Sequence, residues 1–204
     1  MTFPQRKITF IFLNYLLFPV VLIYLKWIKM KMIKIKFRKP KGSEYKEFAR
    51  VENSEAKQYM SVFTPSECTM LCVGKASEKD LAESAKTRKF LIATINNKIV
   101  GTMRYYLKEN GILWISMIQV LPKYQKIGVG SGLLSEIEKR AKRLGIDAIA
   151  LEAQKKADWA IKFYKANNYK ILNIKELNKK PFVGTLLKPP VTHTYIFGKV
   201  LKNT

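Results

Sequence analysis

Cysteine and histidine are scarce in this chain of 204 residues, which holds two cysteines and one histidine. Two cysteines are too few for a disulfide framework. Cys68 and Cys72 are four residues apart and could share one face of a helix, but no histidine or further cysteine is close enough in sequence to complete a metal site. We therefore expect two reduced, structural thiols, a structural role for His193 and no metal.

Acidic side chains are also few, with 15 Asp and Glu against 38 Lys and Arg and a formal net charge of +23. Residues 1–41 hold ten of the basic residues and no acidic one, and the rest of the chain still has 28 basic against 15 acidic residues. This charge favours anionic partners such as CoA, anionic lipid or nucleic acid. The lysines are scattered, and no aromatic-basic stripe or nucleic-acid motif accompanies them, so nucleic acid is the least favoured of the three.

Long uncharged apolar runs are limited to one segment near the N-terminus. Ile8 to Leu25 contains no charged residue, and its length of eighteen residues meets the minimum for a transmembrane helix. Lys and Arg crowd the segment that follows, so the positive-inside rule would place the rest of the chain in the cytoplasm, with these basic residues against an anionic membrane surface. The sequence therefore predicts a membrane anchor over residues 8–28.

Hydrophobic periodicity and turn signals predict a mixed α/β chain without internal repeats. Asn96-Asn97 and Asn110-Gly111 are hairpin signals, and Gly145 is expected to end the longest helix. A long connection over 176–191 is expected to be either a surface insertion or a loop over a substrate site, and 66–76 is not assigned. Strands are predicted over 30–37, 90–95, 98–107, 112–121, 146–151, 169–174 and 194–201, and helices over 43–60, 77–86, 129–144 and 158–167.

The most informative segment is Gln125-Lys-Ile-Gly-Val-Gly-Ser131, which joins a predicted strand to a predicted helix. Gly128 and Gly130 let the backbone turn with no Cβ in the way and leave several N–H groups unpaired at the helix N-terminus. Such donors, together with the positive end of the helix dipole, suit a pyrophosphate, and Lys123 and Lys126 add positive charge. The segment lacks the Lys-Ser/Thr ending of a P-loop and the acidic residue about 20 positions beyond a dinucleotide fingerprint, which argues against both nucleotide motifs.

The segment resembles the pyrophosphate-binding motif of the GNAT family of acyl-CoA N-acyltransferases, Gln/Arg-x-x-Gly-x-Gly/Ala, which reads here from Gln125 to Gly130. Ala157 to Tyr169 is similar to the family's second signature and follows at a family-like separation. The resemblance extends from about Met30 to Lys202 and implies the GNAT fold, an α/β mixed sheet with helices on both faces, for a domain over residues 30–204. Because relatives usually begin near their first strand, Met30 and Met32 are alternative starts, and residues 1–29 are either a membrane anchor or a mis-assigned upstream segment.

The resemblance also implies which residues bind acetyl-CoA as the co-substrate. Main-chain groups of Ile118, Gln119 and Val120 are expected to pair with the pantetheine arm and to polarise the thioester carbonyl. Main-chain N–H groups along the glycine turn are expected to contact the pyrophosphate. The residues that would supply them are Gln125, Lys126, Ile127, Gly128, Val129, Gly130 and Ser131.

Two side chains are expected to carry the chemistry. Tyr164 would lie near the CoA sulfur as the general acid, because an unperturbed phenol stays protonated at neutral pH; the alternative is a core aromatic pair with Phe163. Glu152 would end its strand as the general base, at a spacing from Tyr164 that matches the ribosomal-protein alanine acetyltransferases of the family; the alternative is a solvated glutamate. Asp158 and Glu109 are weaker candidates for the base.

The resemblance is weaker on the substrate side, where Lys156-Ala157 replaces the Ser-Asn that is common in those relatives and Asn168-Tyr169 replaces Gly-Phe. The sequence favours a cytoplasm-facing N-acetyltransferase that moves an acetyl group from the thioester directly to a primary amine of a protein or small molecule. The alternative is a non-catalytic protein of the same fold that docks on anionic membrane or nucleic acid. The motifs fix neither the amine, the acyl-chain preference nor the oligomeric state.

Overall fold

The computed structural model describes residues 33–71, 73–183 and 193–201. The chain divides into two units, Met1–Ile35 and Lys36–Thr204, and every element named below belongs to the second. The membrane anchor predicted over residues 8–28 lies outside the described residues. Within the described ranges, no helix is long and apolar enough to cross a membrane.

The described residues form a mixed sheet with the strand order β1-β2-β3-β4-β5-β7-β6. Among these strand pairs only β4 and β5 run parallel. Asn96 and Asn97, with φ of 49° and 62°, close the β2–β3 hairpin as predicted. The strands are β1 Lys36–Arg38, β2 Lys89–Ile95, β3 Lys98–Leu107, β4 Leu113–Val120, β5 Ala148–Gln154, β6 Lys170–Ile171 and β7 Thr194–Val200.

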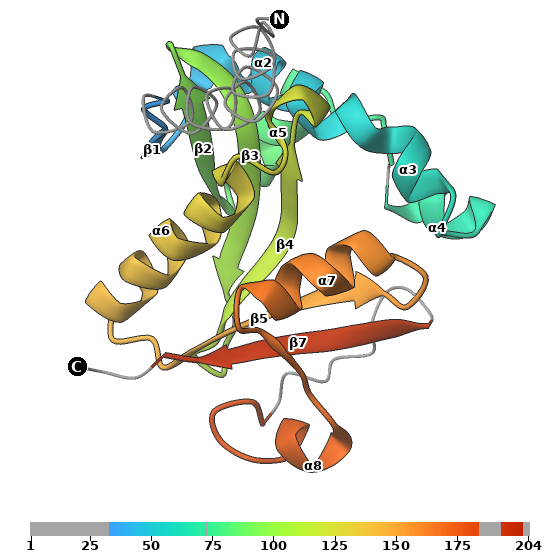
Figure 1. The fold of residues 1–204 in the computed structure, drawn as a ribbon, viewed down its shortest axis with the longest axis vertical. Coiled ribbons are helices and arrows are strands. Elements are labelled where there is room, and N and C mark those ends of the chain that lie inside the picture. Colours follow the sequence, from blue (N-terminus) through green and yellow to red (C-terminus); the bar gives the residue numbers. More distant parts are fainter. Residues whose placement is uncertain (1–32, 72, 184–192, 202–204) are drawn as a thin grey trace, which may run out of the picture. The chain divides into compact units, whose positions relative to one another are not determined.

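Helices cover both faces of this sheet (Figure 1). On one face, which we call the α2 face, Phe48 and Val51 of α2 join Phe90 and Ile92 of β2 in a buried apolar cluster. On the opposite face, the α6 face, Val129 of α6 comes within 2.9 Å of the place that a Cβ on Gly101 of β3 would take. The α-helices are α2 Tyr45–Glu52, α3 Ala56–Met60, α4 Pro65–Met70, α5 Glu78–Ser84, α6 Val129–Arg143, α7 Asp158–Ala166 and α8 Ile174–Leu177, and the short 3₁₀ turns are η1 Gly42–Glu44, η2 Asn53–Glu55 and η3 Pro122–Tyr124.

The single helix predicted over 43–60 is wrong, because the chain breaks after α2 into η2 and α3. The break coincides with Asn53, whose side-chain amide donates to the carbonyl of Ala76 at 2.8 Å and accepts from its N–H at 3.0 Å. This pairing fixes the end of α2 against the segment that leads into α5. The unassigned stretch 66–76 contains most of α4, which Thr64 caps by accepting from the N–H of Glu67.

Two predictions near the C-terminal half also need correction. The strand predicted over 146–151 is β5, and it continues to Gln154 because β7 pairs with it along its whole length. Glu152 therefore lies inside a strand and not at its end. The strand predicted over 169–174 shortens to β6, since Asn173 caps α8 by accepting from the N–H of Glu176 at 2.9 Å.

Candidate functional site

β4 and β5 are paired over only part of their length. Their parallel register ends at Ile115–Leu151, whereas β4 continues to Val120 and β5 to Gln154. The divergence begins at a β-bulge, where Ser116 is the extra residue of β4 between two successive pairs with β3. Because a bulge bends and twists its strand, β4 turns away from β5 (Figure 1). We call the diverging segments, residues 116–120 and 152–154, the β4–β5 fork.

The three β4 residues predicted to contact acetyl-CoA all lie on this fork, but their main-chain groups point in different directions. The N–H of Leu121 donates to the carbonyl of Val100 in β3 at 2.9 Å. Since successive residues of a strand alternate in direction, the main-chain groups of Gln119 face β3, and those of Ile118 and Val120 face the fork. The side chain of Gln119 is buried and donates to the Val120 carbonyl at 3.2 Å.

The glycine turn places a row of N–H donors at the N-terminus of α6. Lys126 and Gly128 have φ of 61° and 93°, and the first helical bond runs from the N–H of Gly132 to the carbonyl of Gly128 at 2.8 Å. Within the described residues, no acceptor takes the N–H groups from Lys126 to Ser131. A Cβ on Gly128 would meet nothing within 4 Å, so the space beside these donors is open to an anion.

The fork and this helix terminus adjoin each other. The side-chain amide of Gln125 donates to the carbonyl of Val120 at 3.1 Å, which ties the turn to the end of β4. Gly130 has a different role from Gly128, because a Cβ there would lie only 3.0 Å from the Phe163 ring of α7, a tight contact. The missing side chain of Gly130 thus lets α7 approach α6.

Tyr164 of α7 is buried in an aromatic cluster on the α6 face. Its ring centroid lies 5.2 Å from Phe163, 6.3 Å from Tyr169 and 5.4 Å from Phe197 of β7. Burial raises the pKa of its hydroxyl well above the ordinary value, and the nearby phenol of Tyr59 in α3 adds to the rise. The hydroxyl therefore keeps its proton at neutral pH, as a proton donor must.

Glu152 of β5 is half-buried and held by one strong hydrogen bond. The Thr194 hydroxyl of β7 donates to its Oε1 at 2.6 Å. Burial raises the pKa of the Glu152 carboxyl, while the Thr194 hydrogen bond and the positive charge of Lys108 act in the opposite direction. A carboxylate with a raised pKa is better matched to taking a proton from an amine than an exposed one.

The two candidate catalytic side chains lie on opposite faces of the sheet. Phe197, which contacts Tyr164, is in register with Leu151, whereas the next β5 residue, Glu152, is in register with Ile196. Since neighbouring residues of a strand point to opposite faces, Glu152 projects from the α2 face. The sequence spacing of the two residues does not reveal this separation. Because the sheet separates the side chains of Glu152 and Tyr164, both can reach the same bound molecule only where β4 and β5 diverge.

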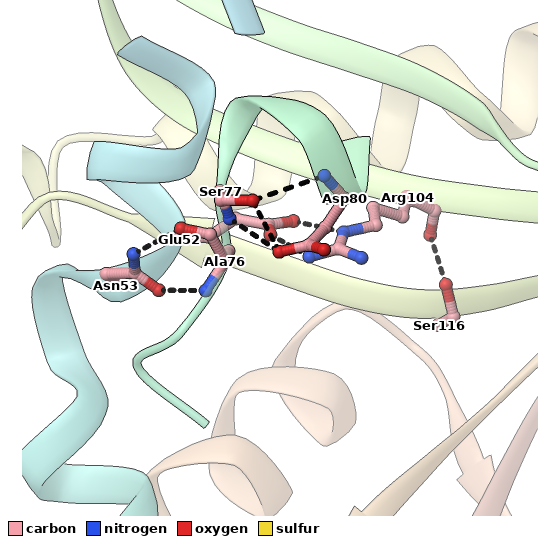
Figure 2. Close-up of polar contacts among 7 residues, drawn as sticks. All are labelled: Glu52, Asn53, Ala76, Ser77, Asp80, Arg104 and Ser116. Atoms are coloured by element: carbon pink, nitrogen blue, oxygen red, sulfur yellow. Dashed lines mark hydrogen bonds and ion pairs between the residues drawn. The ribbon is translucent and has the colours of Figure 1, made fainter. Parts of the chain in front are cut away.

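Sequence reasoning missed a buried ion pair beside the bulge, between Glu52 of α2 and Arg104 of β3 (Figure 2). The Arg104 Nε donates to Glu52 Oε1 at 2.6 Å, a second guanidinium nitrogen binds the other oxygen, and the side chains are 17% and 2% exposed. The carbonyl of Arg104 accepts from the Ser116 hydroxyl at the bulge. The signal available in the sequence was Arg104 itself, the one charged residue between Ile99 and Leu107.

The other candidates have less support from their surroundings. Asp158 is exposed at the start of α7 and Glu109 is exposed after β3. Cys68 lies in α4 as a free thiol, and Cys72 is outside the described residues. The His193 carbonyl accepts from the N–H of Lys155 at 2.8 Å. Within the described part of the chain, no group of three or more His, Cys, Asp or Glu could hold a metal ion.

Comparison with known proteins decides the family. The sequence model of the acetyltransferase (GNAT) family matches residues 50–169, a range that contains the fork, the glycine turn and α7. The chain belongs to the GNAT family. The predicted GNAT fold is confirmed by the solved structures that superpose on it.

Three proteins that resemble this GNAT chain share less than a third of the aligned residues with it. The uncharacterized N-acetyltransferase YjcF of Bacillus subtilis is 29% identical over 100 residues, which cover 49% of this chain and 69% of YjcF. The PaiA N-acetyltransferase of Thermoplasma acidophilum, solved in complex with coenzyme A, superposes with a TM-score of 0.64 at 19% identity, over 82% of this chain and 99% of that one. The ribosomal-protein-S18-alanine N-acetyltransferase of Escherichia coli gives a TM-score of 0.57 at 17% identity, over 83% and 95%.

Proposed function

We propose that this protein is an acetyl-CoA-dependent N-acetyltransferase, which moves an acetyl group from the thioester directly to a primary amine of a protein or small molecule. The observation that carries the proposal is the fork with a row of N–H donors at its edge. The donors from Lys126 to Ser131 suit the pyrophosphate of acetyl-CoA, and the charges of Lys123 and Lys126 strengthen the attraction. In our proposal, main-chain groups of Ile118 and the N–H of Val120, which face the fork, pair with the pantetheine arm.

Acetyl transfer has three chemical requirements that the site must meet. The amine must lose a proton to attack, the thioester oxygen needs a donor as negative charge grows on it, and the leaving sulfur needs a proton. In our proposal Glu152 takes the amine proton, main-chain N–H groups on the fork stabilise the oxygen, and the Tyr164 hydroxyl donates to the sulfur as the C–S bond breaks. No covalent bond to the enzyme forms, so no nucleophilic cysteine is needed.

Binding of acetyl-CoA to the full chain tests the pyrophosphate site, with isothermal titration as the readout. Gly128→Glu places a carboxylate in the open space beside the N–H donors, where it repels phosphate. We expect its Kd for acetyl-CoA to rise about 100-fold or more, equivalent to about 2.7 kcal/mol. Wild-type affinity in this variant would refute the pyrophosphate assignment.

Two matched variants separate charge from backbone strain. Gly128→Ala imposes the strain of a Cβ at a φ of 93° without adding charge. Gly42→Glu adds the same charge where a Cβ meets nothing within 4 Å. We expect Gly128→Ala to weaken binding far less than Gly128→Glu, and Gly42→Glu to bind as the wild type does.

A further inference from the structure

A polar network holds the C-terminal end of α7, the helix that carries Tyr164. α7 lies over β5 and β7 (Figure 1) and ends at its C-cap, Asn167. The Nζ of Lys199 in β7 donates to the Asn167 carbonyl at 3.1 Å and to both carboxylate oxygens of Glu138 in α6 at 2.8 Å. A cation at this end of a helix also interacts favourably with the helix dipole. Lys199 thus joins α6, α7 and β7 at one point.

Tyr169 connects this network to Tyr164. Its N–H donates to the Tyr164 carbonyl at 3.0 Å, and the two rings meet edge to face with centroids 6.3 Å apart. Its hydroxyl donates to Glu138 Oε1 at 3.1 Å, and the Lys199 Nζ lies 5.3 Å from its ring centroid. Because Tyr169 is also 1% exposed, its main chain, ring and hydroxyl are all held in place. A continuous series of contacts therefore runs from Lys199 to the candidate general acid.

The sequence motif of the family does not account for this network. Asn168-Tyr169 stands where the ribosomal-protein alanine acetyltransferases of the family commonly have Gly-Phe. Asn168 has a φ of 64°, the left-handed conformation that glycine adopts most easily. A phenylalanine in place of Tyr169 has no hydroxyl to donate to Glu138. The hydrogen bond between Tyr169 and Glu138 is therefore a feature of this chain and adds a link between α6 and the residues that follow α7.

We propose that Glu138, Tyr169 and Lys199, which we call the α7 anchor, position Tyr164 for proton transfer to the CoA sulfur. A proton donor must lie within hydrogen-bond reach of the atom that it protonates, and a displacement of about 1 Å can cost about 100-fold in rate. The candidate pyrophosphate site lies at the N-terminus of α6, away from the α7 anchor. Loss of the anchor should therefore lower turnover and leave acetyl-CoA binding intact. This positioning role rests on the proposed acetyl transfer and on Tyr164 as its general acid.

Steady-state acetyl transfer and isothermal titration with acetyl-CoA, both on the full chain, test the role of the anchor. Lys199→Met keeps the aliphatic stem of the side chain but removes the cation that joins the three elements. We expect kcat to fall about tenfold or more, and the Kd for acetyl-CoA to stay within about twofold of the wild-type value. Glu138→Gln keeps the shape of its side chain, weakens the bonds to Lys199 and should lower kcat by about threefold or more.

The same substitution in the Tyr164→Phe background separates positioning from a general loss of structure. If Lys199 acts through the Tyr164 hydroxyl, Lys199→Met should change kcat by about twofold or less once that hydroxyl is gone, because the effects of residues that act as a unit do not add. A loss of about tenfold in both backgrounds would show that Lys199 does not act through Tyr164 and would overturn the proposed positioning.

Arg140→Met is the matched control. The Glu136–Arg140 pair belongs to the same helix, and its side chains are 22% and 19% exposed, as are Lys199 and Glu138. Arg140 also bonds Tyr105, so this pair ties α6 to β3 and not to α7. Its loss should lower Tm as the loss of the Lys199 cation does, but keep the wild-type kcat.

The outcomes separate the role of the anchor from the proposed function. A wild-type kcat in both Lys199→Met and Glu138→Gln would overturn the positioning role and leave acetyl transfer standing. An unchanged turnover in Tyr164→Phe would do the same, because there would be no general acid to position. A wild-type protein that binds acetyl-CoA but acetylates no amine would overturn the proposed function itself.

Discussion

At the scale of single residues, the Thr194 hydroxyl lowers the pKa of the Glu152 carboxyl. It donates to the carboxylate at 2.6 Å and so stabilises the ionised form, in opposition to burial. A base must be ionised to take a proton, so kcat/KM should fall as the pH drops through the pKa of Glu152. Thr194→Val removes the donor that lowers the pKa of Glu152, so it should raise that pKa further and move the acidic limb of the pH profile to higher pH.

The matched control for this substitution is Thr194→Ser, which keeps a hydroxyl at the same position and should keep the wild-type profile. The measurement is kcat/KM for one amine from pH 5 to 9. Coincident profiles for the valine and serine variants would show that Glu152 is not the group whose ionisation limits the reaction.

At the scale of elements, the Glu52–Arg104 pair fixes α2 to β3 next to the bulge that opens the fork. Both side chains are largely buried, and removing one partner leaves the other as an uncompensated buried charge. We expect Glu52→Gln, which keeps the shape of the side chain, to lower the free energy of unfolding by about 3–5 kcal/mol. Urea unfolding followed by circular dichroism measures the loss.

The control is Glu47→Gln, which breaks an exposed pair with Arg50 on the same helix and should cost about 1 kcal/mol or less. A double variant, Glu52→Gln with Arg104→Met, should regain part of the stability because no buried charge is left unpaired. Equal losses for Glu52→Gln and Glu47→Gln would mean that water or another group compensates Arg104.

Elements that depend on local signals were predictable from the sequence. The β2–β3 hairpin follows from Asn96-Asn97, the start of α6 from the glycine turn and its end from Gly145, which has a φ of 68°. Features that depend on partners far along the chain were not predictable. The bulge at Ser116 is a matter of register with β3, the Glu52–Arg104 pair joins positions 52 residues apart, and the length of β5 is set by β7.

The residues of the candidate site likewise fall into those that local sequence motifs reveal and those that depend on distant partners. The glycine turn could be found because its chemistry lies in one continuous segment, and Tyr164 because a second motif surrounds it. The positions of Glu152 and Tyr164 on opposite faces of the sheet depend on the register of β5 with β7 and on the packing of Tyr164 against Phe197, which the residues of β5 do not specify. The contact between Lys108 and Trp114, where the Lys108 Nζ lies 4.1 Å from the ring centroid, carried no signal in the sequence, because it exists only once β3 and β4 are paired.

At the scale of the whole molecule, we expect acetyl-CoA to raise the free energy of unfolding, because a ligand that binds the native state stabilises it. At an acetyl-CoA concentration of 100 times the Kd, the gain in the free energy of unfolding is about 2.7 kcal/mol, which corresponds to a rise in Tm of about 5–10 °C for a protein of this size.

Tyr164→Phe keeps the ring among Phe163, Tyr169 and Phe197 and loses only the hydroxyl, so it should show the same rise in Tm with acetyl-CoA. Its turnover should nevertheless fall by about 100-fold if the hydroxyl is the general acid. Thermal unfolding and steady-state transfer on the same preparations separate the outcomes: an unchanged turnover would remove the hydroxyl from the reaction, and a lost rise in Tm would assign Tyr164 to binding of acetyl-CoA.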